Sequence, residues 1–205
     1  MTHLNKLFFI FICMFLWLAL PIYGQATREH ILLDNHWKFT LGHATDPSKD
    51  LYYRVYNDFS KTLSKGINFS SIDYDDSAWQ TVDLPHDWAV TLPFSEKGDW
   101  SHGYKALGNA FPEHSIGWYR KTFDLSKSEA GKRIELQFDG IFRDSRCWVN
   151  GIYVGHHLSG YTGVKYDITD LVHFSKPNVI TVRVDATQNE GWFYEGAGIY
   201  RHVWL

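Results

Sequence analysis

The residues best suited to chemistry lie near the C-terminus, in the segment Glu190-Gly191-Trp192-Phe193-Tyr194-Glu195. A ligand that has both apolar faces and polar edges is bound by an aromatic platform together with polar groups. The segment has this composition, and Trp192 and Glu195 are candidates for contacts with such a ligand. Two alternatives remain: at least one of the aromatics packs in the core or at a domain interface, and Glu195 pairs with Arg201 in its loop.

A second group of polar residues follows Pro85, where a short apolar run ends. His86 and Asp87 at such a strand end are candidates for the same pocket. The competing interpretation is that they form hydrogen bonds within the loop, as polar loop residues commonly do. Trp88 is expected to pack rather than to bind.

Several other kinds of site find no support in the sequence. His156 and His157 would point to opposite faces of a strand, and the remaining histidines lack ligand spacing, so we predict no metal site. No Gly-rich loop joins a strand to a helix, and no G-x-S-x-G motif is present, which argues against nucleotide binding and serine hydrolysis. Cys147 lies on an alternating strand and is expected to be a small buried hydrophobe.

These candidate residues need a β-rich framework, and its centre runs from Ile134 to Leu171. Ile134, Leu136 and Phe138 alternate with polar residues, the period of a half-buried strand. Asn150-Gly151 stands between two alternating runs and predicts a tight antiparallel hairpin. With flanking strands at 37–41, 118–123 and 179–184, the pattern predicts an all-β, jelly-roll-like antiparallel β-sandwich.

Two long connections interrupt this pattern. Residues 42–76 are the least patterned part, and we predict a long surface excursion there, with a short helix within 50–63 where apolar residues recur at helical spacing. Residues 91–115 are loop-like and rich in Gly, Pro and aromatic residues. Long loops on a β-sandwich are where binding usually takes place.

Composition limits the class of protein. The 205 residues suffice for one domain with a sizeable core, and 17% are aromatic while only 21% are charged, which excludes a disordered chain. The net charge of −3 gives no reason to expect nucleic acid or an anionic membrane as a partner.

The first residues form a separate unit. Lys6 precedes 14 uninterrupted apolar residues, Leu7 to Leu20, a run better suited to a secretory signal peptide than to a membrane span. We predict a signal peptide at 1–24 and a domain at 25–205, with an uncleaved membrane anchor as the alternative. One cysteine would then remain, so no internal disulfide could form, which suits a bacterial periplasm or cell surface.

Five motifs carry a resemblance to a known family. They are DNHWKF (34–39), LPHDW (84–88), GWYRKTF (117–123), the central stretch with WVNGIYVG (148–155), and GAGIYRHVWL (196–205). In this order they resemble the N-terminal sugar-binding domain of family 2 glycoside hydrolases, which include β-galactosidases, β-glucuronidases and β-mannosidases. The resemblance covers nearly all of the chain after residue 30 and implies a galactose-binding-domain-like fold.

The resemblance also implies where catalysis takes place. In this family both catalytic glutamates lie at strand ends of a (β/α)₈ barrel, which needs about 250 residues. None of the seven glutamates here lies in a matching motif, so no catalytic residue is assigned. They are Glu29, Glu96, Glu113, Glu129, Glu135, Glu190 and Glu195.

The family's sugar contacts carry over only in part. An Asp that touches the sugar in well-known β-galactosidases and β-glucuronidases lies six residues before the Gly that matches Gly198, and Trp192 occupies that position here. The departure puts galactose or glucuronate specificity in doubt. His114 lies three residues before Gly117, where some β-galactosidases have a sugar-contacting Asn. The resemblance thus implies that the ligand of Trp192, Glu195, His86 and Asp87 is a carbohydrate, and His114 joins these candidates.

The resulting hypothesis is the N-terminal domain of a secreted, retaining β-galactosidase-like enzyme that acts on terminal β-glycosides. The expected partners are the carbohydrate and a catalytic barrel of the same full-length chain, with no nucleic acid and no membrane after signal cleavage. No cofactor is expected in this segment, although Mg²⁺ or Na⁺ could serve the full-length enzyme. The abrupt end at Leu205 suggests a fragment; the alternatives are a stand-alone carbohydrate-binding module and a non-functional remnant.

Overall fold

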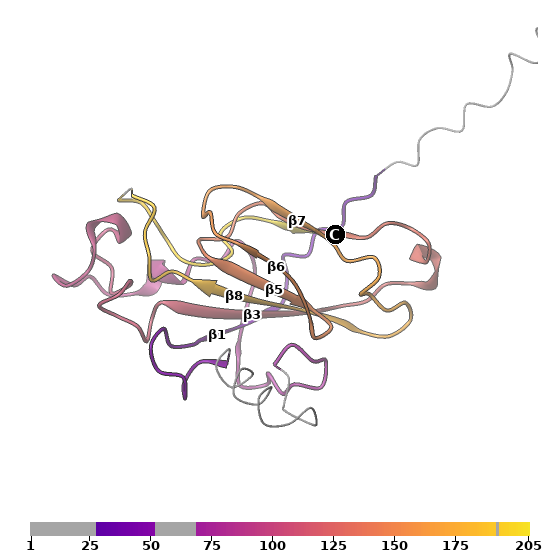
Figure 1. Ribbon diagram of the computed structural model, residues 1–205, viewed down its shortest axis with the longest axis horizontal. Helices are drawn as coiled ribbons and strands as arrows, with labels where there is room; N and C mark the ends of the chain where they lie inside the picture. Colours follow the sequence, from indigo (N-terminus) through magenta and orange to yellow (C-terminus); the bar gives the residue numbers. More distant parts are fainter. Residues whose placement is uncertain (1–27, 52–68, 192) are drawn as a thin grey trace, which may run out of the picture.

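The computed structural model describes residues 28–51, 69–191 and 193–205, which form two antiparallel sheets packed face to face (Figure 1). The predicted signal peptide at 1–24 and most of the predicted helix within 50–63 lie outside the described residues. Three short 3₁₀-helices occur among the described residues, and Leu51 is the one described residue in an α-helical state. The 3₁₀-helices are η1 (Trp88–Thr91), η2 (Trp100–His102) and η3 (Lys127–Glu129).

The larger sheet has six strands in the order β2-β1-β3-β8-β5-β6. Their bounds are β2 Gln80–Val82, β1 Trp37–Leu41, β3 Ile116–Phe123, β8 Asn178–Asp185, β5 Ser145–Val149 and β6 Ile152–His157. The long strands β3 and β8 pair over their whole length, from Ile116 opposite Asp185 to Phe123 opposite Asn178. These two strands form the centre of the sheet.

The smaller sheet has three strands in the order β7-β4-β9. They are β7 (Val164–Asp167), β4 (Glu135–Phe138) and β9 (Val203–Trp204). An N-terminal segment extends the sheet, because the backbone N–H of Ile31 donates to Leu205 at 2.7 Å and Leu205 donates back at 2.8 Å. The all-β antiparallel sandwich predicted from the sequence is confirmed.

The main core lies between the two sheets. Leu136 and Phe138 of β4 point inward and are fully buried, and Tyr119, Ile180 and Val182 of the larger sheet face them in the same cluster. This alternation is the one that the sequence pattern predicted for residues 134–138. The Asn150-Gly151 turn is confirmed too, with φ of 50° and 87°, the positive values that such a turn requires.

Cys147 of β5 is buried in the same core, and burial raises the pKa of its thiol well above the ordinary range. A thiol that stays protonated is a poor nucleophile. The prediction that Cys147 is a small buried hydrophobe is confirmed.

The outer face of the larger sheet is also covered. Phe69, from the long connection after β1, packs against Trp118 of β3 and Trp148 of β5, with ring centroids 4.7 and 5.2 Å away. The connection was predicted to be a surface excursion, but its described parts close a second hydrophobic cluster.

The loops that carry the candidate residues gather at one end of the sandwich (Figure 1). Ile116 at the start of β3 lies opposite Asp185 at the end of β8, and Ser145 at the start of β5 lies opposite His157 at the end of β6. The connections before β3 and β5 and after β6 and β8 must therefore meet there. We call this the loop end. Within the described residues no helix is long and apolar enough to cross a membrane.

Candidate functional site

The carboxylate of Glu195 closes the loop that was predicted to bind sugar. Its Oε1 atom accepts hydrogen bonds from the backbone N–H groups of Glu190 and Gly191, both at 2.7 Å. The hydroxyl of Tyr161 donates to the same oxygen at 3.2 Å. Glu195 is only 5% exposed, so its side chain holds the loop from inside.

Glu190, at the start of this loop, fixes it to a neighbouring loop. Its Oε1 atom accepts from the Arg143 Nε atom at 3.1 Å and from the backbone N–H of Gly160 at 3.0 Å. The hydroxyl of Tyr200 in turn donates to the Gly160 carbonyl at 2.7 Å. Three segments far apart in the sequence are thereby joined at the loop end.

The loop that Glu190 and Glu195 hold in place exposes aromatic side chains. Phe193 and Tyr194 are 62% and 61% exposed, and Tyr161 lies beside Tyr194 with ring centroids 6.4 Å apart. Neither Phe193 nor Tyr194 packs in the core that the described residues form. Trp192 lies outside the described residues, and its contact with sugar stays a prediction.

The structure gives Asp87 several partners within the chain. Its Oδ1 atom accepts from the backbone N–H of Ala89 at 2.9 Å, which caps η1, and from that of Ala197 at 2.8 Å. Trp88 donates its backbone N–H to the Ala197 carbonyl at 3.0 Å. Asp87 therefore joins two loops; burial raises the pKa of its carboxyl group.

His86 lies next to this junction and points inward. Its Nδ1 atom is 2.7 Å from the hydroxyl of Tyr119, and its backbone N–H donates to Ile199 at 2.8 Å. Burial lowers the pKa of the imidazole, which favours the neutral ring. These contacts correspond to the alternative of hydrogen bonding within the loops, and a sugar contact by His86 or Asp87 stays a prediction.

His114 lies on the same side of the molecule and is partly buried. Its Nδ1 atom is 3.0 Å from the Ala106 carbonyl, and its own carbonyl accepts the indole N–H of Trp88 at 2.7 Å. The ring stacks on Phe111 at an interplanar angle of 10°. The structure brings all four described candidates, His86, Asp87, His114 and Glu195, to the loop end or the connections that form it.

His102 was missed by the sequence patterns. It ends η2, is 2% exposed, and neither ring nitrogen has a hydrogen-bond partner among the described residues. Burial lowers the pKa of its imidazole. The carboxylates of Glu195, Asp99 and Asp87 act in the opposite direction but do not outweigh burial. No spacing in its loop sets it apart, whereas Tyr161, also missed, lies in the G-Y pair of the central stretch.

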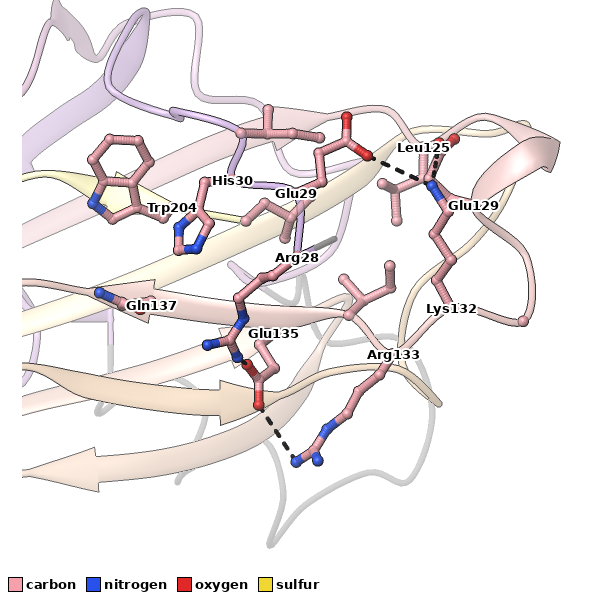
Figure 2. A pocket seen from close by; sticks show the side chains of 14 residues that line it. Arg28, Glu29, His30, Leu125, Glu129, Lys132, Arg133, Glu135, Gln137 and Trp204 are labelled. Atoms are coloured by element: carbon pink, nitrogen blue, oxygen red, sulfur yellow. Dashed lines mark hydrogen bonds and ion pairs between the residues drawn. The ribbon is translucent and has the colours of Figure 1, made fainter. Parts of the chain in front are cut away.

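A separate groove lies away from the loop end, at the edge of the smaller sheet (Figure 2). Its volume is about 510 Å³, and Leu125, Ile134 and Trp204 supply apolar walls. The charged side chains around it pair with one another: Glu135 with Arg28 and Arg133, and Lys132 with Glu29 and Glu129. A ligand there would have to displace these ion pairs.

Residues 28–51, 69–191 and 193–205 were predicted to hold no metal site, and their acidic, histidine and cysteine side chains form no large cluster. No three His, Cys, Asp or Glu side chains come together there in a way that could hold an ion.

Comparisons with known proteins agree on one family. Residues 31–205 match the family model described as "Glycosyl hydrolases family 2, sugar binding domain". The chain is 40% identical over 144 residues to the β-galactosidase BoGH2A of Bacteroides ovatus, which covers 70% of this chain and 16% of that enzyme. It is 36% identical over 150 residues to a putative β-glucuronidase of Formosa agariphila, with coverage of 73% and 14%.

Solved structures are similar in the same part. A family 2 glycosyl hydrolase from Bacteroides cellulosilyticus has a TM-score of 0.66 at 31% identity, over 86% of this chain and 20% of that one. A β-glycosidase from Bacteroides vulgatus has a TM-score of 0.66 at 30% identity, with the same coverage. The chain thus spans about a fifth or less of the length of each of these relatives.

Proposed function

The chain belongs to glycoside hydrolase family 2, as that family's sugar-binding domain, and from this premise we propose that it serves a retaining β-glycosidase as the N-terminal part that shapes the sugar pocket. The catalytic acid and nucleophile then lie in a barrel outside these 205 residues. In such an enzyme one carboxylate attacks the anomeric carbon while the other protonates the leaving group, and water then releases the sugar.

The observation that carries the proposal is the loop clamped by Glu195. Two exposed aromatic rings, those of Phe193 and Tyr194, stand at its tip, and Tyr161 from a neighbouring loop stands beside them. Aromatic faces bind the apolar side of a sugar ring, and rigid loops on a β-sandwich place such faces reproducibly. This aromatic surface supports the proposal that the loop forms a wall of the sugar pocket.

The charges at the loop end favour a neutral sugar. Four carboxylates, those of Asp87, Asp99, Glu190 and Glu195, gather there. The nearby cation Arg143 already pairs with Glu190. A uronic acid, which is anionic at neutral pH, would be repelled by this arrangement, so we propose a β-galactoside rather than a β-glucuronide.

Export is part of the same proposal. A positive residue followed by an apolar run of 14 residues supports a signal peptide at 1–24 and a location in the periplasm or at the cell surface. The N-terminal sequence of the mature protein tests this part, because an intact Met1 would contradict cleavage.

The decisive experiment isolates the native polypeptide with an antibody against this domain and measures its mass and activity. We expect a mass several times that of this chain, 23.9 kDa, with faster hydrolysis of 4-nitrophenyl β-D-galactoside than of the β-D-glucuronide. A species with the mass of residues 25–205 that binds sugar without hydrolysis would instead identify a stand-alone module. The same species without sugar binding would identify a remnant.

A further inference from the structure

We propose that Glu195 is a positioning residue for the sugar and not a sugar ligand: together with Glu190 it forms a two-carboxylate clamp that sets where the aromatic tip of its loop stands. The inference rests on the proposed function, since it concerns the same sugar site. It assigns to Glu195 a role different from the contact that composition alone predicted.

The clamp is made of backbone donors and fixed side chains. Glu195 Oε1 accepts from two consecutive N–H groups of its own loop, those of Glu190 and Gly191, and from the Tyr161 hydroxyl. Glu190 Oε1 accepts from the Gly160 N–H and the Arg143 guanidinium. One carboxylate therefore curls the loop, and the other attaches it to the loop that carries Tyr161.

The burial of Glu195 favours a positioning role over a direct contact with the sugar. Glu195 is 5% exposed, its Oε1 atom already accepts three hydrogen bonds, and its Oε2 atom is buried, so a sugar hydroxyl would have to displace protein atoms to reach either oxygen. The residues that this clamp orients, Phe193 and Tyr194, are the exposed ones. The clamp can therefore act on the sugar through the position of these rings.

The charge of Glu195 matters to the clamp more than its shape. Hydrogen bonds to an ionised acceptor are about twice as strong as neutral ones. A Glu195→Gln variant keeps the size and can keep a carbonyl oxygen at the Oε1 position, but it loses the charge, so the three donors there meet a weaker, neutral acceptor. The loop should then open more often while the sandwich stays folded.

The first readout is hydrogen exchange of the full polypeptide, measured by mass spectrometry on peptides that span 186–197. We expect exchange at Glu190 and Gly191 to become about tenfold faster in Glu195→Gln, because their acceptor is weakened. Glu96→Gln makes the same chemical change on an exposed loop and serves as the matched control. Unchanged exchange in Glu195→Gln would overturn the inference whatever the activity of the enzyme.

The second readout separates a positioning residue from a ligand. Glycosides that lack one hydroxyl at a time are hydrolysed by wild type and by Glu195→Gln. A positioning role predicts that KM rises about three- to tenfold for all of these substrates, with kcat within about twofold. A direct contact predicts that the substitution has no further effect on the one glycoside that lacks the contacted hydroxyl, a result that would refute the inference.

A double-mutant cycle that combines Glu195→Gln with Tyr161→Phe is the third readout. Because the hydroxyl of Tyr161 acts through Glu195, the two substitutions together should raise KM by less than the product of their separate effects. Independent effects would contradict the clamp. If wild type hydrolyses no β-glycoside, the proposed function fails and the positioning role falls with it, whereas an active wild type with additive effects refutes the positioning role alone.

Discussion

At the scale of single residues, Asp87 and Gly196 form the tightest junction at the loop end. A Cβ atom on Gly196 would lie 2.0 Å from Asp87 Oδ2, far inside van der Waals contact. Gly196→Ala must therefore push Asp87 away from the N–H groups of Ala89 and Ala197. We expect a loss of about 2–3 kcal/mol in the free energy of unfolding, measured by urea denaturation.

The Asp87→Ala background provides the control for this prediction. In this background the carboxylate that the new methyl group would meet is absent. Gly196→Ala should therefore lower the free energy of unfolding by less than about 1 kcal/mol. Equal losses in both backgrounds would show that the contact between residues 87 and 196 does not limit the junction.

A buried histidine, His102, and a partly buried one, His86, give the fold a pH dependence. Burial lowers the pKa of His102 and His86 in the folded state below the ordinary value of 6.5. As the pH falls through 6.5, the unfolded chain takes up protons that the folded chain does not, so these groups destabilise the fold on acidification. The raised pKa of Asp87 acts in the opposite direction at lower pH.

Replacing His102 should therefore reduce the pH dependence of stability. In His102→Gln we expect the urea midpoint to fall less between pH 7.5 and pH 5.5 than in wild type. His30 is exposed, and His30→Gln should keep the wild-type dependence. A His102→Gln curve parallel to that of wild type would assign the pH dependence to other groups.

The residue types in the sequence were enough to select side chains at the loop end. They did not show what each of these side chains does there. Asp87 and Glu195 were singled out because carboxylates fix sugar hydroxyls, and in the structure both accept hydrogen bonds from backbone N–H groups of adjacent loops. Buried loop backbone needs acceptors, and a carboxylate serves that need as well as it serves a ligand. Composition cannot separate the two uses, because the partners come from distant segments.

At the scale of elements, a buried carboxylate helps to fix the connection after β1 to the larger sheet. Asp50 is fully buried, its Oδ1 accepts the Trp118 indole N–H at 2.7 Å, and its Oδ2 accepts from two nitrogens of Arg183 at 3.2 and 3.0 Å. Asp50→Ala removes this carboxylate from the buried guanidinium of Arg183, which also pairs with Asp185 at 3.1 Å.

This substitution should be strongly destabilising. We expect Asp50→Ala to lose about 3–5 kcal/mol of unfolding free energy, the usual effect of breaking a buried ion pair. Trp118 and Trp148 should become more exposed to water, which shifts tryptophan emission to longer wavelength. Asp73 is exposed in the same connection, so Asp73→Ala should leave both the urea midpoint and the emission unchanged. A small effect of Asp50→Ala would mean that other contacts, the aromatic cluster and the bonds of Arg120 to Asp76, Phe69 and Ser71, hold the connection.

The elements that could be predicted are those set by local rules. The Asn150-Gly151 hairpin and the alternating strand around Leu136 follow from turn chemistry and period-2 burial, and both are present. The cover over the outer face of β8 was not predicted, because Arg183 looks like a solvent-facing residue on an alternating strand. Its burial depends on Asp50, 133 positions earlier, and no local pattern contains that contact.

At the scale of the whole molecule, the two ends of the sandwich differ. Trp100, Phe193 and Tyr194 are exposed at the loop end, whereas Tyr153 is exposed near the Asn150-Gly151 turn at the opposite end. Large exposed aromatic surfaces mark places where another surface docks. In the proposed enzyme the loop end faces the catalytic barrel and the sugar, and the hairpin end does not.

Hydroxyl-radical footprinting can compare the two ends in one experiment. In this 205-residue chain all four side chains should be oxidised readily, because each is at least 50% exposed. In the full-length polypeptide we expect oxidation of Trp100, Phe193 and Tyr194 to fall about fivefold or more, since a packed interface excludes water from its centre. Tyr153 should be oxidised equally in both and is the internal control. Equal oxidation of the loop-end aromatics in the two forms would show that the rest of the enzyme does not cover this end, and the pocket-shaping role would then have no surface on which to act.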